Sequence, residues 1–164
     1  MKNGLPCGVF VLGLALAGFA GAAAAHEELG FELNITLSPK AAERLRATHE
    51  GITADASYYG DPTAAAVKQA DEVGHIPLGV ERIDLPGRAG PVRFSGQKLS
   101  HERLDWITGG VKVNVNLYSA RHSSSDNILA CDFIDGSLAD VVKAQPVTLH
   151  CGLITENAKT ALKP

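Results

Sequence analysis

The chain has 164 residues, of which 45% are hydrophobic and 20% are charged, and its formal net charge is −3. This length suits one domain with a real hydrophobic core and is too short for two. The mild acidity, without any basic run, argues against a surface that binds nucleic acid or an anionic membrane.

The N-terminal segment has the pattern of a signal peptide. Lys2 precedes an apolar run over 5–21 that ends in four alanines, and the small residues Ala23 and Ala25 satisfy the A-x-A rule of signal peptidase. We therefore expect cleavage between Ala25 and His26. A membrane anchor is the alternative, but the run is short for a span of about 20 strongly apolar residues.

Cleavage at this position defines the expected organisation of the chain. Residues 1–25 form the signal peptide, and residues 26–164 form a single β-rich domain with no membrane insertion. Cys7 lies inside the signal peptide, so the mature chain keeps only Cys131 and Cys151 of the three cysteines. Export delivers this pair to an oxidising compartment.

The first half of the mature chain predicts three strands and one helix. Apolar and polar residues alternate over 30–37, 52–59 and 75–85, which is typical of half-exposed strands. Ser38 as a cap and Pro39 at the first helical position predict a helix that runs to about His49. Within the third strand, the parity changes at Ile83 and Leu85, which indicates an irregularity. The segment 63–73 fits a helical turn and an exposed loop equally well.

The second half contains the clearest strand, 111–118. Apolar residues alternate with polar ones along it, so one face is expected to be buried and the other exposed to solvent. The apolar residues are Val111, Val113, Val115 and Leu117. A short strand at 92–94 and a short helix over 99–107, with Trp106 on its buried side, precede it. Two further apolar runs, 128–134 and 146–155, follow it, with at most two helical turns at 138–144 between them.

The two remaining cysteines share the inward parity of their apolar neighbours. Cys131 has the parity of Leu129 and Phe133, and Cys151 has that of Leu149. A buried Cys131–Cys151 disulfide follows, and a bridge closing a loop of about twenty residues would contribute roughly 3 kcal/mol. The alternatives are two buried thiols, or a metal held together with His150. Joint ligation is awkward because neighbours on a strand face opposite sides of the sheet.

About seven strands, short connecting helices and one disulfide between strands predict a mainly β fold. We expect an antiparallel sandwich of immunoglobulin-like or transthyretin-like character. Trp106 does not lie between the cysteines, as the tryptophan of true immunoglobulin domains does. The alternative is an α+β arrangement with helices on one face of a single sheet.

The sequence contains no strong catalytic motif. Ser123 to Ser125 lie beside His122 and Asp126, but neighbours in one loop cannot adopt triad geometry among themselves, and there is no G-x-S-x-G elbow. We interpret this segment as a solvated loop. An enzyme is therefore the less favoured class.

A copper site is the alternative functional prediction. The six histidines show no H-x-H or H-E-x-x-H spacing. Cleavage after Ala25 would, however, leave His26 at the N-terminus, where its amine and ring nitrogen can chelate Cu(II). At this one residue the chain resembles histidine-brace copper proteins. A second ligand would have to come from His75, His122 or His150.

Tyr58 and Tyr59, followed by the turn at 60–62, are the best candidate for a binding edge, because tyrosine is favoured at interfaces. The alternative places one tyrosine in the core and the other over a surface strand. The sequence thus predicts a small, monomeric, non-catalytic binding or accessory domain, periplasmic or secreted, that meets an unidentified protein or envelope component of a bacterium.

Overall fold

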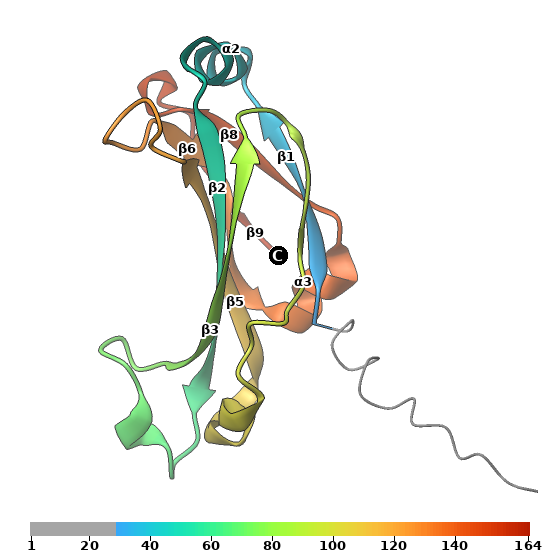
Figure 1. Ribbon diagram of the computed structural model, residues 1–164. Helices are drawn as coiled ribbons and strands as arrows, with labels where there is room; N and C mark the ends of the chain where they lie inside the picture. The colour runs from blue at the N-terminus through green and yellow to red at the C-terminus, as the bar shows by residue number, and fades with distance from the viewer. Residues whose placement is uncertain (1–28) are drawn as a thin grey trace, which may run out of the picture.

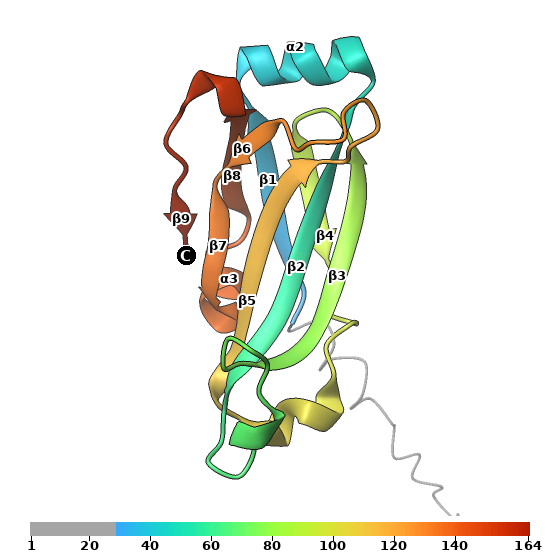
Figure 2. The ribbon, with the colours of Figure 1, turned by 90° about the vertical axis from the view of Figure 1, so that its left-hand side faces the viewer.

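The computed structural model describes residues 29–164, which form two β-sheets packed face to face. One sheet has four strands in the order β4-β1-β8-β6, and the other has five in the order β3-β2-β5-β7-β9. In Figure 2 the five-stranded sheet faces the viewer and the four-stranded sheet lies behind it. The expected mainly β sandwich is confirmed, and the alternative single sheet is not what forms.

The strands have the following bounds. The four-stranded sheet contains β4 (Gly90–Phe94), β1 (Phe31–Leu37), β8 (Val147–Leu153) and β6 (Leu129–Cys131). The five-stranded sheet contains β3 (Ile76–Pro86), β2 (Gly51–Pro62), β5 (Ile107–Ser119), β7 (Phe133–Ser137) and β9 (Leu162–Lys163).

Two of the strand pairs are parallel, which a purely antiparallel sandwich would not contain. β1 pairs parallel with β8, with Leu33 opposite Val147, and β7 pairs parallel with β9. The other pairs are antiparallel. The physical reason lies after β1, where a helix carries the chain to the other sheet, so β1 finds its partners much later in the sequence.

That helix is α2 (Pro39–Thr48), which lies across one end of the sandwich (Figure 2). Its cap is as expected, because the Ser38 hydroxyl accepts a hydrogen bond from the Ala41 backbone N–H. The other helices are α3 (Leu138–Ala144) and the short 3₁₀ turns η1 (Val67–Gln69), η2 (His101–Trp106) and η3 (Ile154–Glu156). Within residues 29–164 no helix is long and apolar enough to cross a membrane.

A single core fills the space between the sheets. The inward side chains of its central strands are almost completely buried, and they include Phe31, Leu33, Ile35, Ile52, Ala54, Ala56, Tyr58, Val113, Val115 and Leu149. The expected faces of 30–37, 52–59 and 111–118 are therefore confirmed. Burial of apolar surface at about 25 cal/mol per Å² is the main stabilising contribution to such a core.

The Cys131–Cys151 disulfide is present and joins two residues that lie directly opposite each other on β6 and β8. The chain then changes sheets at Asp132, since β6 belongs to one sheet and β7 to the other. The predicted common parity of Cys131 and Phe133 is therefore wrong. Ile134, not Phe133, is the fully buried residue of β7.

Two local expectations need correction. Trp106 is 38% exposed, because η2 is only a 3₁₀ turn at the end of the sandwich. Leu99, Leu104 and Ile107 of this segment pack against the core instead. The irregularity of the 75–85 strand lies earlier than expected. The register shifts where Tyr58 and Tyr59 face Gly79 and Pro77, and Val80 is 53% exposed instead of buried.

Candidate functional site

Tyr58 and Tyr59 lie on β2, which is flanked by β3 and β5, so they belong to the face of a sheet and not to its edge. Tyr58 points into the core and donates a hydrogen bond from its hydroxyl to Glu81 Oε2 at 3.0 Å. Burial, the Glu81 charge and this hydrogen bond raise the pKa of the Tyr58 phenol. Tyr59 points the other way, to the solvent side, so only Tyr59 is positioned to meet a ligand.

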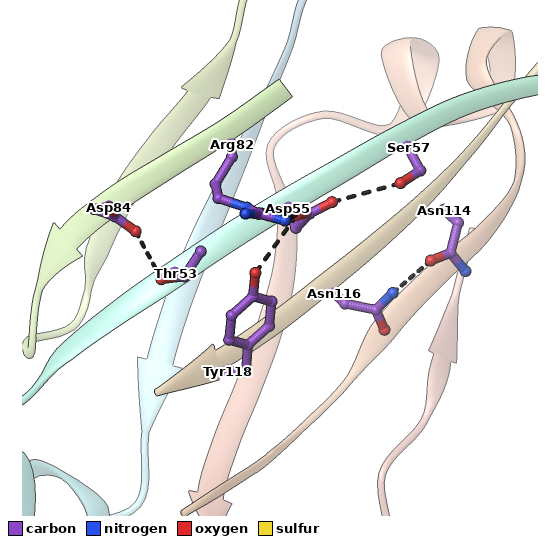
Figure 3. Close-up of polar contacts among 8 residues, drawn as sticks. All are labelled: Thr53, Asp55, Ser57, Arg82, Asp84, Asn114, Asn116 and Tyr118. Atoms are coloured by element: carbon purple, nitrogen blue, oxygen red, sulfur yellow. Dashed lines mark hydrogen bonds and ion pairs between the residues drawn. The ribbon is translucent and has the colours of Figure 1, made fainter. Parts of the chain in front are cut away.

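We call this solvent side of the five-stranded sheet the outer face. The side chains that point to it from β2, β3 and β5 are largely polar (Figure 3), and they include Thr53, Asp55, Ser57, Arg82, Asp84, Asn114, Asn116 and Tyr118. Two loops extend beyond one end of this sheet, as Figure 2 shows, and neither they nor α2 lie over its middle.

The middle of the outer face is a closed ionic network. Arg82 donates from Nε and from its terminal nitrogen to Asp55 Oδ2, at 2.8 and 2.7 Å. The hydroxyls of Ser57 and Tyr118 also approach the Asp55 carboxylate, at 3.4 and 3.5 Å. These contacts use most of the hydrogen-bonding capacity of Asp55, so this part of the face is structural.

At one end of the outer face the surface is hollowed into an open pocket of about 680 Å³, which we call the outer-face pocket. Residues from six segments line it. They include Ser57 and Tyr59 of β2, Pro77 and Val80 of β3, Asn114 of β5 and Asp135 of β7, with Asp71 and His75 from the segment before β3 and Lys98, Ser100 and Arg103 from the segment between β4 and β5.

The bulge in β3 creates one wall of this pocket. Gly79 has a φ of +148°, and a Cβ atom there would lie 2.1 Å from the Lys98 carbonyl oxygen. Only glycine permits so close an approach. The Ser100 N–H donates to the Leu78 carbonyl at 2.6 Å. The loop that carries Lys98 and Ser100 is thereby fixed against the end of the sheet.

Tyr59 forms the opposite part of the lining. Its ring stacks on His75 with centroids 4.4 Å apart, and its hydroxyl donates to Asp135 Oδ1 across the intervening strand β5. Burial, the hydrogen bond to Asp135 and the charges of Asp135 and Asp61 raise the pKa of Tyr59 to about 12. The phenol is therefore protonated at neutral pH and acts as a hydrogen-bond donor.

The pocket also contains a cation with spare donors. Arg103 donates one hydrogen bond from its guanidinium to the Pro77 carbonyl at 2.8 Å, and its guanidinium carbon lies 5.9 Å from the centre of the Trp106 ring. Among the described residues no carboxylate pairs with Arg103 or with Lys98. A guanidinium has five N–H donors, so most of them remain available to a ligand.

One further titratable group, Glu50, serves the structure and not catalysis. Glu50 is 2% exposed, and its carboxylate accepts hydrogen bonds from the backbone N–H groups of Gly51, His122 and Ser123 and from the Ser123 hydroxyl. The serine loop beside His122 thus anchors onto Glu50 and forms no catalytic triad.

The predicted metal ligands are not brought together. His26 lies outside the described residues. His75 stacks on Tyr59, His122 lines a separate cleft beside α2, and His150 Nδ1 lies 3.0 Å from Thr36 Oγ1 on the four-stranded sheet. From Leu29 to Pro164, no group of three or more histidine, cysteine or carboxylate side chains could hold a metal ion.

Sequence reasoning identified Tyr59 but missed most of the pocket, notably Asn114, Asp135 and Arg103. The outward position of Asn114 was readable from the alternation along 111–118. The positions of Asp135 and Arg103 depend on which strands are neighbours, and no local pattern carries that information.

Comparisons with known proteins give no family for this chain. No protein-family model, curated protein or solved structure matches it.

Proposed function

We propose that this protein is an exported, non-catalytic binding domain that takes its ligand in the outer-face pocket. The observation that carries the proposal is the pocket itself. It gathers hydrogen-bonding and charged side chains from β2, β5, β7 and two loops at one open depression on the sandwich. Convergent polar groups in a concave site are the usual mark of a ligand site.

The compartment in the proposal rests on two observations. The Cys131–Cys151 disulfide indicates an oxidising, non-cytoplasmic compartment. The signal-peptide pattern of 1–25 supports export, and we propose a bacterial periplasm or cell envelope as the destination. The mature protein acts there as a monomer on a small molecule or on an exposed part of an envelope component, not on nucleic acid.

The test is a ligand screen read by two-dimensional NMR on the isotopically labelled mature protein. The panel contains neutral oligosaccharides, amino acids and short peptides, and dicarboxylates. We expect one class to shift the amide signals of pocket residues such as Ser57 and Asn114. The same class should give no shift in Asn114→Arg, whose long side chain fills the pocket. Shifts that map elsewhere, or an unchanged response in Asn114→Arg, would overturn the proposal.

A further inference from the structure

We propose that the outer-face pocket binds a short extended peptide with free termini, holding the carboxylate at Arg103 and the ammonium group at Asp135. This inference rests on the proposed function and adds the chemical class of the ligand. It follows from where the charges of the pocket lie relative to the strands.

Arg103 and Asp135 place opposite charges at the two ends of the pocket. The lining also includes the Asp71 carboxylate, whose Oδ1 already accepts hydrogen bonds from the Val73 and His75 N–H groups. Arg103 is fixed to Pro77, at the start of β3, while Asp135 lies on β7. β2 and β5 separate these strands, so the backbones of β3 and β7 lie three strand spacings, or roughly 14 Å, apart. An extended peptide covers about 3.3 to 3.6 Å per residue, so about four residues fit this distance.

The Arg103 end suits a carboxylate. Its guanidinium is held by the Pro77 carbonyl on one edge and by the Trp106 ring below, and Lys98 lines the same side of the pocket. The arginine is therefore oriented before a ligand arrives. Bidentate pairing with a carboxylate is the interaction that a planar guanidinium makes best.

The Asp135 end suits an ammonium group. Asp135 Oδ1 accepts the Tyr59 hydroxyl hydrogen bond, which fixes the orientation of the carboxylate and leaves Oδ2 without a partner among the described residues. Between the two ends, Ser57 and Asn114 line the floor. The Ser57 O–H donates to Asp55, so the Ser57 oxygen remains as an acceptor. Asn114 Oδ1 accepts from Asn116 Nδ2, so the Asn114 N–H₂ group remains as a donor. Such groups match the alternating N–H and C=O groups of an extended backbone.

A neutral glycan fits the same pocket less well. It would cover Arg103, Lys98 and Asp135 without supplying a countercharge, and desolvating charges without pairing them is unfavourable.

The experiment measures the dissociation constant of tetraalanine by calorimetric titration on the mature wild-type protein. The peptide is used with free termini, with a C-terminal amide and with an N-terminal acetyl group. We expect each modification to weaken binding at least tenfold. Because this comparison changes only the ligand, it does not depend on the folding of any variant.

Protein variants then assign each terminus to its residue. Arg103→Gln should weaken binding of the free peptide at least tenfold and leave binding of the amidated peptide unchanged. Asp135→Asn should also weaken binding of the free peptide at least tenfold, and it should leave binding of the acetylated peptide unchanged. Arg93→Gln and Asp126→Asn, which lie outside the pocket, are the matched controls and should bind like wild type.

The outcomes separate this inference from the proposed function. Tetraalanine that binds equally well with blocked termini, or that is insensitive to Arg103→Gln, overturns the inference. If maltotetraose shifts the amide signals of the pocket and tetraalanine does not, the proposed binding function is supported and the inference of a peptide ligand is overturned. If neither peptides nor the other ligand classes perturb the pocket, both proposals fail.

Discussion

Glu50 shows how single carboxylates hold the loops of this protein in place. It follows α2 and binds the loop after β5 through the N–H groups of His122 and Ser123 and the Ser123 hydroxyl, and it also accepts from the N–H of its neighbour Gly51. Glu81 binds the N–H groups of Ser95 and Gly96 in the same way, and Asp132 binds those of His150 and Ala161. Each carboxylate therefore connects segments that are distant in the sequence.

These contacts predict how stability depends on pH. Burial alone would raise the pKa of Glu50, but the hydrogen bonds from Ser123, His122 and Gly51 outweigh it and lower the pKa to about 2. At Glu81 and Asp132 burial would also raise the pKa of the carboxyl group, but hydrogen bonds to it outweigh burial. The pKa values of both groups are therefore lowered. A group with a lowered folded pKa stabilises the protein above its unfolded pKa, which is about 4.3 for glutamate.

We therefore expect the free energy of unfolding to fall as the pH drops from about 5 toward 2, because the unfolded chain takes up protons first. Urea denaturation at a series of pH values between 2.5 and 7 measures this. A free energy that stays constant over this range would contradict the assignment of these carboxylates as loop anchors.

Glu50→Gln tests one anchor directly. The glutamine amide presents an N–H₂ group to the surrounding donors and removes the charge that they bind. We therefore expect the free energy of unfolding to fall by about 2 kcal/mol at pH 7. The variant should also show a shallower pH dependence than wild type. Glu43→Gln, on the exposed side of α2, is the control and should be as stable as wild type.

At the scale of elements, the bulge of β3 determines the shape of the outer-face pocket. In Gly79→Ala the new methyl group meets the Lys98 carbonyl, and the positive φ becomes strained. We expect the free energy of unfolding, measured by thermal denaturation, to fall by about 2 kcal/mol. The NMR amide signals of the loop around Lys98 should also shift. Gly136→Ala, where a Cβ has open space, should change neither property.

The disulfide makes the corresponding prediction for β6 and β8. It closes a loop with a sequence separation of 20, so Cys131→Ser should lower the free energy of unfolding by about 3 kcal/mol and leave Cys151 open to alkylation in denaturant. Reduction of the wild-type protein should cause a loss of similar size. Two alkylatable thiols in the exported wild-type protein would contradict this prediction.

These elements also show what the sequence could predict. The strands at 30–37, 52–59 and 111–118 alternate with period two, so their location and buried faces were predictable. The position of the β3 bulge was not, because Val80 looks like a core residue until the loop at Lys98 is seen against Gly79. The shift in parity at Asp132 was hidden for the same reason, since it depends on which sheet the next strand joins.

At the scale of the molecule, the N-terminus of the mature protein decides the copper prediction. Mass spectrometry of the exported protein should give the mass of residues 26–164 with two hydrogens missing for the disulfide. With His26 at the terminus, one equivalent of Cu(II) should give an electron paramagnetic resonance spectrum typical of nitrogen ligation. His26→Ala is the control and should lose that signal. A mature N-terminal residue other than His26 would contradict the prediction of a copper site.

The pairing of β1 with β8 has a consequence for the order in which the protein can fold. β1 lies between β4 and β8, and Leu33 must find Val147 before the sheet is complete. The four-stranded sheet therefore cannot close while the chain is still emerging, whether from a ribosome or from a membrane channel. Non-local pairing of this kind folds slowly. A delay until nearly all of the chain has emerged is compatible with the export that we propose, because an exported chain crosses the membrane before it acquires its structure.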